Sequence, residues 1–194
     1  MPKKIHRNLY HLLVGLLFPL GYHFAHTRIW PSIFIGVLLS LMIVFEVQRF
    51  RKPGFNRWVF EHVSALVKKS EEKKPTGTTF FLLSVLLTVS LFPKYIAVSA
   101  LTFLALGDVA AAMVGEKWGR VRIFSKSLEG FLAFFVVALL SGLFLMRLYP
   151  DLTLHLVTIG ALAAAIIEIL PLPVDDNFSI PLLTSIVMLV AVKF

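Results

Sequence analysis

The residues of this chain best suited to chemistry lie in one run, from Gly107 to Gly130. Asp108 stands inside an apolar segment, and Lys126 and Glu129 open the next apolar segment after a short basic loop. A carboxylate within a membrane span is energetically costly, so it is a functional candidate by default. The run therefore predicts a catalytic site in which Asp108, Lys126 and Glu129 take part.

Small residues follow Asp108 at helical spacing. At about 100° per residue, Ala112, Gly115 and Gly119 fall on the same helical stripe as Asp108. Small side chains allow another helix to approach closely. Asp108 is therefore predicted to face a tight helix contact or the bundle interior, and not lipid.

The basic loop is the predicted phosphate site. It runs from Gly115 to Gly119 and continues with Arg120, Arg122 and Lys126. Glycines let backbone N–H groups approach phosphate oxygens, and the start of the following helix favours anions. An alternative for the arginines stays open, because the cytosolic loops of membrane proteins are basic in any case.

The start of the following helix has its own alternative. Ser125 or Ser127 is suited to cap that helix, and Glu129 then lies in its first turn, where an acidic side chain is favourable. Ser127 is also a candidate phosphate ligand beside Lys126. The spacing is not that of a Walker A loop.

Glu168 repeats the pattern of Asp108 near the end of a later apolar segment. It shares one helical face with Ala161, Ala164 and Ala165. Two carboxylates on two stripes of small residues are predicted to converge on one site, although such stripes are also ordinary in membrane helix packing.

Side chains with oxygen atoms that can bind a metal follow Glu168 closely in the sequence. After two prolines, Asp175, Asp176 and Asn177 precede the last apolar segment. Mg²⁺ is usually held by one or two carboxylates together with substrate phosphates. Asp108, Asp175 and Asp176 are therefore the predicted magnesium ligands, with Asn177 as a further polar residue beside the phosphates. An acidic turn that caps the last helix is the alternative.

One histidine is a candidate for a place in the site. Arg7 and His11 lie one helical turn apart at the start of the first apolar segment. His11 is predicted to line the site, or else to be a polar residue at the membrane interface.

The composition indicates an integral membrane protein. Of 194 residues, 58% are hydrophobic and the mean hydropathy is +0.84, whereas soluble domains are about 45–50% apolar. A single membrane domain, residues 1–194, is predicted. The absence of cysteine excludes disulfides, thiolate catalysis and Cys-ligated zinc. The net charge of +8 is better explained by cytosolic loops than by nucleic-acid binding.

The predicted fold is all-α, a polytopic membrane helix bundle of about seven transmembrane helices. A span needs about 20 mostly apolar residues. The predicted spans are roughly Leu9–His26, Ile29–Val47, Thr78–Phe92, Tyr95–Val114, Leu128–Leu148, Thr153–Ile169 and Phe178–Ala191. The polar stretch Phe50–Gly77 carries an amphipathic pattern from Phe55 to Val67. It is predicted to form a helix on the cytosolic membrane surface, or one packed on the bundle.

Basic residues predict the orientation. With a cytosolic N-terminus, 15 of the 19 Lys and Arg residues fall on the cytosolic side. The basic N-terminal start has no A-x-A cleavage site after it, so it is predicted to be a retained helix. We expect a multi-pass protein of a cell inner membrane or an ER-type membrane, with its active site facing the cytosol.

These motifs resemble the signature of the CTP-dependent lipid kinases, the branch of dolichol, phytol and diacylglycerol kinases, which are related to phosphatidate cytidylyltransferases. The pattern GD-x-x-A-A-x-x-G-x-x-x-G, then K-[ST]-x-E-G, is matched by Gly107, Asp108, Ala111, Ala112, Gly115, Gly119, Lys126, Ser127, Glu129 and Gly130. The chain also resembles that branch in the acidic turn before the last span, at Asp176 and Asn177. Weaker similarities are Arg7 with His11, Glu46 with Arg49, and Thr76 with Gly77. The cytidylyltransferase signature with K-D-x-G and H-G-G-x-x-D-R is absent from the sequence, which favours phosphoryl over cytidylyl transfer.

The resemblance implies transfer of the γ-phosphoryl group of CTP to the hydroxyl of a membrane lipid alcohol: a polyprenol, a phytol-like alcohol or diacylglycerol. Mg²⁺ would bridge the phosphates, Lys126 with Arg120 or Arg122 would neutralise their charge, and Glu129 or Glu168 would orient the hydroxyl or act as base.

Three alternatives stay open: a phosphatidate cytidylyltransferase, an ion-coupled transporter with Asp108 and Glu168 on the ion path, and a non-catalytic scaffold. Transporter sites usually lie near the bilayer midplane, whereas these carboxylates are predicted near its cytosolic edge.

Overall fold

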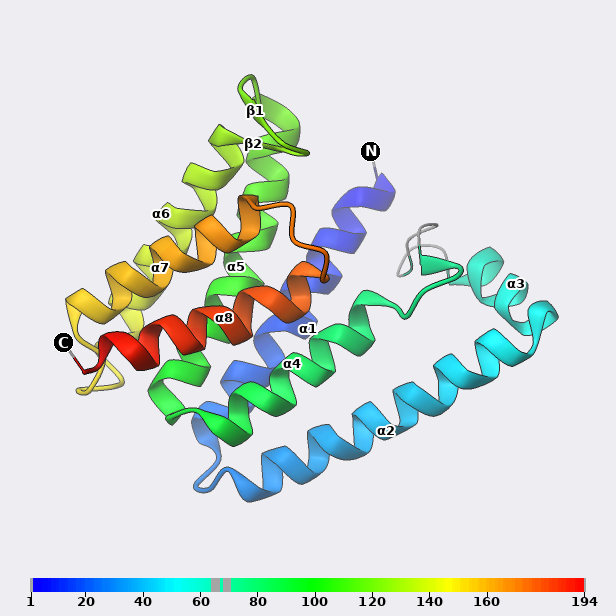
Figure 1. Cartoon of the computed structure of the whole chain (residues 1–194), viewed down its shortest axis with the longest axis horizontal. Helices are drawn as coiled ribbons and strands as arrows, with labels where there is room; N and C mark the ends of the chain where they lie inside the picture. The colour runs from blue at the N-terminus through cyan, green and yellow to red at the C-terminus, as the bar shows by residue number, and fades with distance from the viewer. Residues whose placement is uncertain (1, 64–66, 68–70, 194) are drawn as a thin grey trace.

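The structure is a computed structural model that describes residues 2–63, 67 and 71–193, and among residues 2–10 it describes only the side chain of Asn8. Eight helices and a two-stranded hairpin make up this described part of the chain (Figure 1). The helices are α1 (Pro2–Phe24), α2 (Ile29–Arg51), α3 (Pro53–His62), α4 (Gly77–Leu91), α5 (Lys94–Trp118), α6 (Leu128–Leu145), α7 (Leu154–Ile169) and α8 (Asp176–Ala191), and the strands are β1 (Arg122–Ile123) and β2 (Lys126–Ser127).

All helices except α3 coincide with predicted spans, so the prediction of an all-α membrane bundle is confirmed. By length and composition, α2, α5 and α6 can cross a membrane, and the other four have apolar stretches of 10–17 residues. The number of crossings therefore stays a prediction. Three boundaries were misplaced by four residues or more: α1 begins at Pro2 and not near Leu9, α2 continues past Val47 to Arg51, and α5 continues past Val114 to Trp118. Gly115 consequently lies in a helix and not in a loop.

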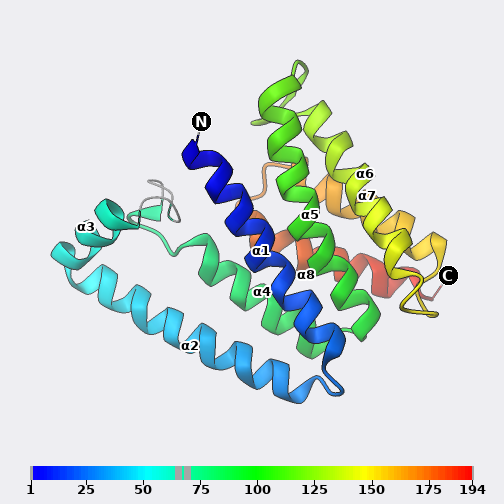
Figure 2. The ribbon, with the colours of Figure 1, turned by 180° about the vertical axis from the view of Figure 1, so that it is seen from behind.

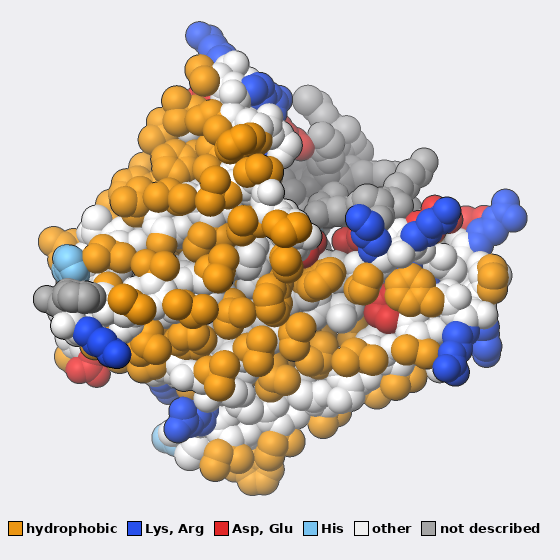
Figure 3. Space-filling view, viewed as in Figure 1, with side chains coloured by type: hydrophobic (Ala, Val, Ile, Leu, Met, Phe, Trp, Pro, Cys, Tyr) orange, Lys and Arg blue, Asp and Glu red, His pale blue; other side chains and the backbone are white. Residues whose placement is uncertain are grey.

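The central helix of the bundle is α5. Of its most apolar window 67% is buried, against 17% for α2. Helix α5 packs on α1, α6, α7 and α8, whereas α2 packs on α3 and α4. Figure 2 shows α1 on the near side of the bundle alongside α5, with α2 at the outer edge. Apolar side chains cover the face shown in Figure 3, and charged side chains gather towards its ends, as expected for a lipid-facing surface.

Helices α5 and α6 approach closely because glycines line their contact. A Cβ at Gly107 would lie 2.7 Å from the ring of Phe134, and a Cβ at Gly130 would lie 3.0 Å from the carbonyl oxygen of Ala111. The stripe of small residues after Asp108 thus serves helix packing, which carries Asp108 to the α6 side of the bundle. The small face of α7 is also buried, at Ala161, Ala164 and Ala165.

A fully buried arginine joins α2 and α3 to the start of α4. The Arg49 guanidinium donates hydrogen bonds to the carboxylate of Glu46, the side chain of Asn56 and the main-chain oxygens of Glu71, Glu72 and Lys74. The other Glu46 oxygen accepts a hydrogen bond from the Thr76 N–H at 2.8 Å. This hub fixes the chain that leads into α4.

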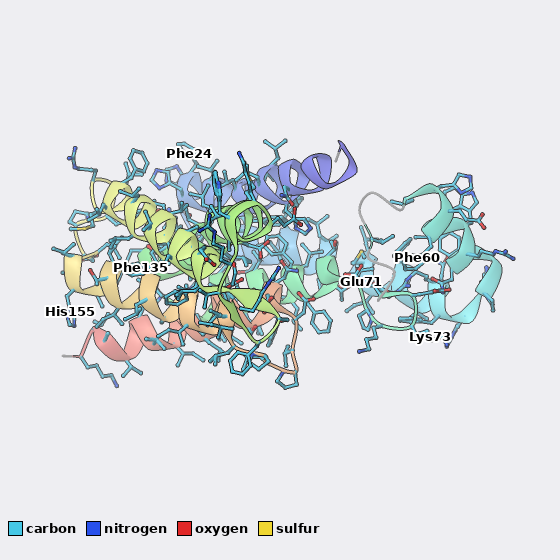
Figure 4. All side chains as sticks on the ribbon, turned by 90° about the horizontal axis from the view of Figure 1, so that it is seen from above. Phe24, Phe60, Glu71, Lys73, Phe135 and His155 are labelled. Atoms are coloured by element: carbon cyan, nitrogen blue, oxygen red, sulfur yellow. The ribbon has the colours of Figure 1, made fainter. Side chains whose placement is uncertain are left out.

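Glu71 extends this hub to the first residue of α4. Figure 4 shows Glu71 between α3 and the rest of the bundle. Its Oε1 accepts a hydrogen bond from the Gly77 N–H at 3.0 Å. The start of α4 is therefore held by two buried carboxylates: Glu46 binds the Thr76 N–H, and Glu71 binds the Gly77 N–H.

The amphipathic helix is shorter than its pattern predicted. Helix α3 ends at His62, and Val67 lies in a bend, while residues 64–66 and 68–70 lie outside the described part. Val59 is 2% exposed and Trp58 is 51% exposed, and Phe55 packs edge-on against Phe45 of α2. Helix α3 therefore packs on α2, and its contact with a membrane surface stays a prediction.

Candidate functional site

A polar cavity of about 250 Å³ lies where the second half of α5 meets the hairpin, α6, α7 and α8. Its lining residues are Asp108, Ala111, Ala112, Gly115, Glu116, Arg122, Lys126, Ser127, Gly130, Glu168 and Asp176. Residues from the two predicted motif regions, 107–130 and 168–177, thus meet in one cavity. Four carboxylates and two cations line it, which suits a polyphosphate accompanied by a metal ion.

Lys126 is held between two acidic side chains. Its Nζ lies 2.9 Å from Asp176 Oδ2 and 3.2 Å from Glu168 Oε1, and it also donates to the main-chain oxygen of Glu168. The tight turn between β1 and β2, with Phe124 at a φ of 56°, presents it to the cavity. Burial lowers the pKa of Lys126, but hydrogen bonds and charges from Asp176 and Glu168 raise that pKa above its ordinary value. The amine is therefore cationic at neutral pH, as a phosphate ligand requires.

Glu168 is a buried carboxylate that can accept a further interaction. The residue is 6% exposed, and within the described residues its Oε2 has no hydrogen-bond partner. Leaving such an oxygen unsatisfied is costly, and a cation would satisfy it. No three His, Asp or Glu side chains of the described chain are grouped to hold a metal by themselves. Mg²⁺ needs only one or two carboxylates beside phosphates, and Glu168 with Asp176 meets that requirement.

A second cavity, of about 40 Å³, adjoins the first at Asp108. Its lining residues are His11, Val14, Gly15, Gly77, Thr78, Phe81, Leu104, Ala105, Asp108 and Asn177. It combines the polar groups of His11 and Asn177 with the apolar side chains of Phe81 and Leu104. Asp108 borders both cavities, and His11 lies beside it, so the structure brings these two predicted site residues together.

The acidic turn before α8 contributes one residue to each cavity: Asp176 lines the polar cavity, and Asn177 lines the small one. Asp175 caps α8, and its Oδ1 accepts hydrogen bonds from the Asn177 N–H at 3.0 Å and from Asn177 Nδ2 at 2.7 Å. Asn177 borders the small cavity, and a Cβ on Gly77 would lie 2.9 Å from its Nδ2. Asp175 is not among the lining residues of either cavity, so the helix-cap alternative describes it. Of the two aspartates, Asp176 is the one that faces Lys126.

Glu129, in the first turn of α6, contacts Arg120 in the loop after α5, and neither residue is among the lining residues of the polar cavity. Glu129 Oε1 accepts hydrogen bonds from the backbone N–H groups of Arg120, at 2.9 Å, and Val121, at 3.2 Å. Ser127 caps α6 by accepting a hydrogen bond from the Gly130 N–H at 3.1 Å. Glu129 therefore braces the loop in this structure. Ser127 caps α6 and also lines the polar cavity, so its role as a phosphate ligand stays a prediction.

The two glycines of the predicted phosphate loop pack against Ser127. A Cβ at either Gly115 or Gly119 would lie 2.9 Å from Ser127 Oγ. Gly115 borders the polar cavity, whereas Gly119 caps the end of α5 and is not among its lining residues. Arg122 and Lys126 are the predicted phosphate cations that do line it.

Sequence reasoning missed Glu116 and the wall that α4 supplies. Glu116 lies eight residues after Asp108, close to the same helical stripe, and it was readable once α5 is extended past Val114. Gly77 and Phe81 belong to a segment whose apolar pattern carried no sign of contact with Asp108. The weak family similarity at Gly77 was the available signal.

Comparison with known proteins is consistent with this geometry. The chain is 27% identical to CTP-dependent diacylglycerol kinase 1 of Saccharomyces cerevisiae, over 98% of this chain and 74% of that protein. It is 34% identical to CTP-dependent diacylglycerol kinase 1 of Schizosaccharomyces pombe, over 69% of this chain and 62% of that protein. It is 27% identical to a probable chloroplastic phytol kinase of Zea mays, over 95% of this chain and 66% of that protein.

These similarities confirm the resemblance to the CTP-dependent lipid kinases that the motifs predicted. The suggested relation to phosphatidate cytidylyltransferases stays a prediction. No family model matches the chain. No solved structure matches it either.

Proposed function

We propose that this chain, a homologue of CTP-dependent diacylglycerol and phytol kinases, is itself a CTP-dependent lipid kinase whose phosphoryl acceptor is the hydroxyl of a membrane lipid alcohol. The observation that carries the proposal is the place of Asp108, which borders both a polar and a partly apolar cavity. Transfer between a soluble nucleotide and a lipid requires both reactants to be held in contact at one point.

The polar cavity is the donor side. Lys126 and Arg122 neutralise phosphate charge, since both cations line the cavity and Lys126 stays protonated at neutral pH. Glu168 and Asp176 are the carboxylates that would hold Mg²⁺, and the metal would offset the negative charge of the phosphates. Lys126, which lies between these two carboxylates, is the cation nearest to where the phosphates would lie, and its amine would donate to them.

The small cavity is the acceptor side. The lipid hydroxyl lies beside Asp108 and His11, and the first carbons of its chain contact Phe81 and Leu104. The hydroxyl oxygen forms a bond to the γ-phosphorus, and the bond from that phosphorus to the β-phosphate oxygen breaks, which releases CDP. Asp108 orients the hydroxyl and takes up its proton.

The protein spans its membrane several times with this site at the cytosolic surface. Support for this orientation comes from the 15 of 19 Lys and Arg residues that a cytosolic N-terminus places on the same side. A soluble nucleotide such as CTP would reach the polar cavity from that side.

The test uses purified full-length protein in detergent with Mg²⁺, a pool of lipid alcohols, and CTP labelled separately at its α and γ phosphates. We expect label to pass from the γ position to a lipid, and the labelled product then identifies the alcohol. Label that passes from the α position would mean cytidylyl transfer and overturn the proposal, as would no transfer from any nucleotide.

Asp108→Asn tests the residue at the junction of the cavities. The variant removes a proton acceptor and a charge while keeping the shape, so kcat should fall at least about 100-fold. Asp151→Asn is the matched control, because Asp151 is an exposed residue in the connection between α6 and α7. Full activity of Asp108→Asn would remove Asp108 from the mechanism.

A further inference from the structure

A third cavity, of about 240 Å³, lies at the other end of α5. Its lining residues are Tyr22, Ala25, His26, Thr27, Arg28, Phe92, Pro93 and Lys94. They come from the connection between α1 and α2 and from the connection between α4 and α5, which lie side by side in Figures 1 and 2. Lys94 precedes Asp108 by fourteen residues on α5, about 21 Å at 1.5 Å per residue. This cavity is therefore separate from the proposed active site.

The polar lining of this third cavity consists of cations and hydrogen-bond donors, without an acidic residue. Arg28 and Lys94 supply the positive charge, and His26 and Thr27 add N–H and O–H groups. Lys94 Nζ is fixed in place, because it donates to the main-chain oxygens of His23, at 2.7 Å, and Ala25, at 2.8 Å. An ammonium group has three donors, so one is left for a ligand.

A tyrosine adds a further donor at the same place. Tyr22 is 5% exposed and lines the cavity. Its ring centre lies 5.6 Å from Lys94 Nζ. The tyrosine hydroxyl is a hydrogen-bond donor of the kind that a phosphate oxygen accepts.

Two helix starts add to the positive potential. Arg28 precedes α2 and Pro93 precedes α5, and both residues line the cavity. Neither helix has a side-chain cap or an acidic residue in its first turn. Helix starts carry partial positive charge from unpaired N–H groups, and here that charge is added to Arg28 and Lys94.

We propose that this cavity binds a phosphate group, supplied by a phospholipid headgroup or by a soluble phosphate. The surrounding surface favours the lipid, because Phe24, Ile29 and Trp30 are 76%, 62% and 75% exposed beside it. Figure 4 shows Phe24 at the outer edge of the bundle. Cations are disfavoured on the non-cytosolic side of membrane proteins, yet two of the four predicted there meet in this one cavity.

The test measures the unfolding temperature of delipidated full-length protein in detergent. The additions are phosphatidylglycerol, phosphatidylcholine, inorganic phosphate, and monoolein as a lipid without phosphate. A ligand at about 100 times its Kd should raise the unfolding temperature by about 5 °C or more. Monoolein should not raise it.

Arg28→Gln tests the assignment to this cavity. Losing a charge-assisted hydrogen bond should weaken phosphate binding at least about tenfold. Arg147→Gln is the matched control, because Arg147 is an exposed cation directly after α6 that does not line the cavity. Arg28→Lys keeps the charge and should retain part of the affinity.

Each outcome decides the proposal. Stabilisation by either phospholipid that Arg28→Gln reduces identifies a lipid headgroup, and stabilisation by inorganic phosphate that Arg28→Gln reduces identifies a soluble anion. Equal losses in Arg28→Gln and Arg147→Gln would show diffuse attraction and overturn a defined site. Stabilisation by none of the phosphates, or equally by monoolein, would also overturn it.

Discussion

Replacing Lys126 by methionine separates two effects of one amine. In the structure Lys126 compensates Glu168 and Asp176, and in the proposed reaction it neutralises phosphate charge. Methionine keeps much of the length of the side chain and removes the charge. The variant should therefore lose stability and activity for different reasons, which a second substitution can separate.

The loss of stability follows from the burial of the partners. Glu168 is 6% exposed, so leaving its carboxylate unpaired should cost about 1.5–3 kcal/mol. The Asp176 side chain is 37% exposed, so solvent screens that pair and it adds only about 0–1 kcal/mol. A total of about 1.5–4 kcal/mol corresponds to a fall of about 3–16 °C in unfolding temperature for a chain of this size.

Glu168→Gln in the Lys126→Met background distinguishes the two effects. The double variant no longer contains the unpaired buried charge, so its unfolding temperature should recover most of the loss. Its kcat with CTP should stay at least about 100-fold below that of Glu168→Gln alone, because the phosphate cation is still missing. If the double variant is as active as Glu168→Gln alone, Lys126 acts only on stability and its assignment to the phosphates is refuted.

Three further predictions follow from other residues. Gly107→Ala should destabilise the protein by about 1–3 kcal/mol in thermal unfolding, since its Cβ would lie 2.7 Å from the Phe134 ring. The control is Gly36→Ala, which should be neutral or slightly stabilising because nothing lies within 4 Å of its Cβ. Equal effects of the two substitutions would contradict the packing argument. Arg49→Met should cost about 3–5 kcal/mol because it leaves a buried carboxylate unpaired, and an unchanged unfolding temperature would contradict the hub. Because the pKa of Lys126 is raised on folding, its stabilising contribution should be complete below about pH 10 and decline only as the pH rises above about 10.5; a loss between pH 7 and 9 would refute it.

Much of the fold could be predicted because long apolar runs in a sequence indicate membrane helices. The seven predicted spans all correspond to helices, with most ends within four residues. The end of α5 was misplaced because Glu116 and Lys117 look like loop residues, although they lie on the last turns of a helix that projects past the apolar core. Patterns of polarity identify the buried length of a helix and not its hydrogen-bonded length.

The sequence predicted which residues belong to the site better than it predicted which cavity each of them faces. The sequence motifs named Asp108, Lys126 and Glu168, which line one cavity. Neighbouring residues such as Asp175 and Asp176 could not be separated, since which one faces the cavity depends on how α8 begins. The wall from α4 is a long-range contact, and it is set by Arg49 and Glu71 through hydrogen bonds that no local pattern encodes.

The small size of the cavity beside Asp108 has a consequence for the hydrolysis of CTP by water. About 40 Å³ is enough for a few water molecules, and such water would stand where the lipid hydroxyl is expected to stand. Water is therefore a competing acceptor, and we expect slow hydrolysis of CTP whenever no lipid alcohol displaces it. The fit of the lipid in this cavity would then decide how many CTP molecules are consumed for each lipid that is phosphorylated.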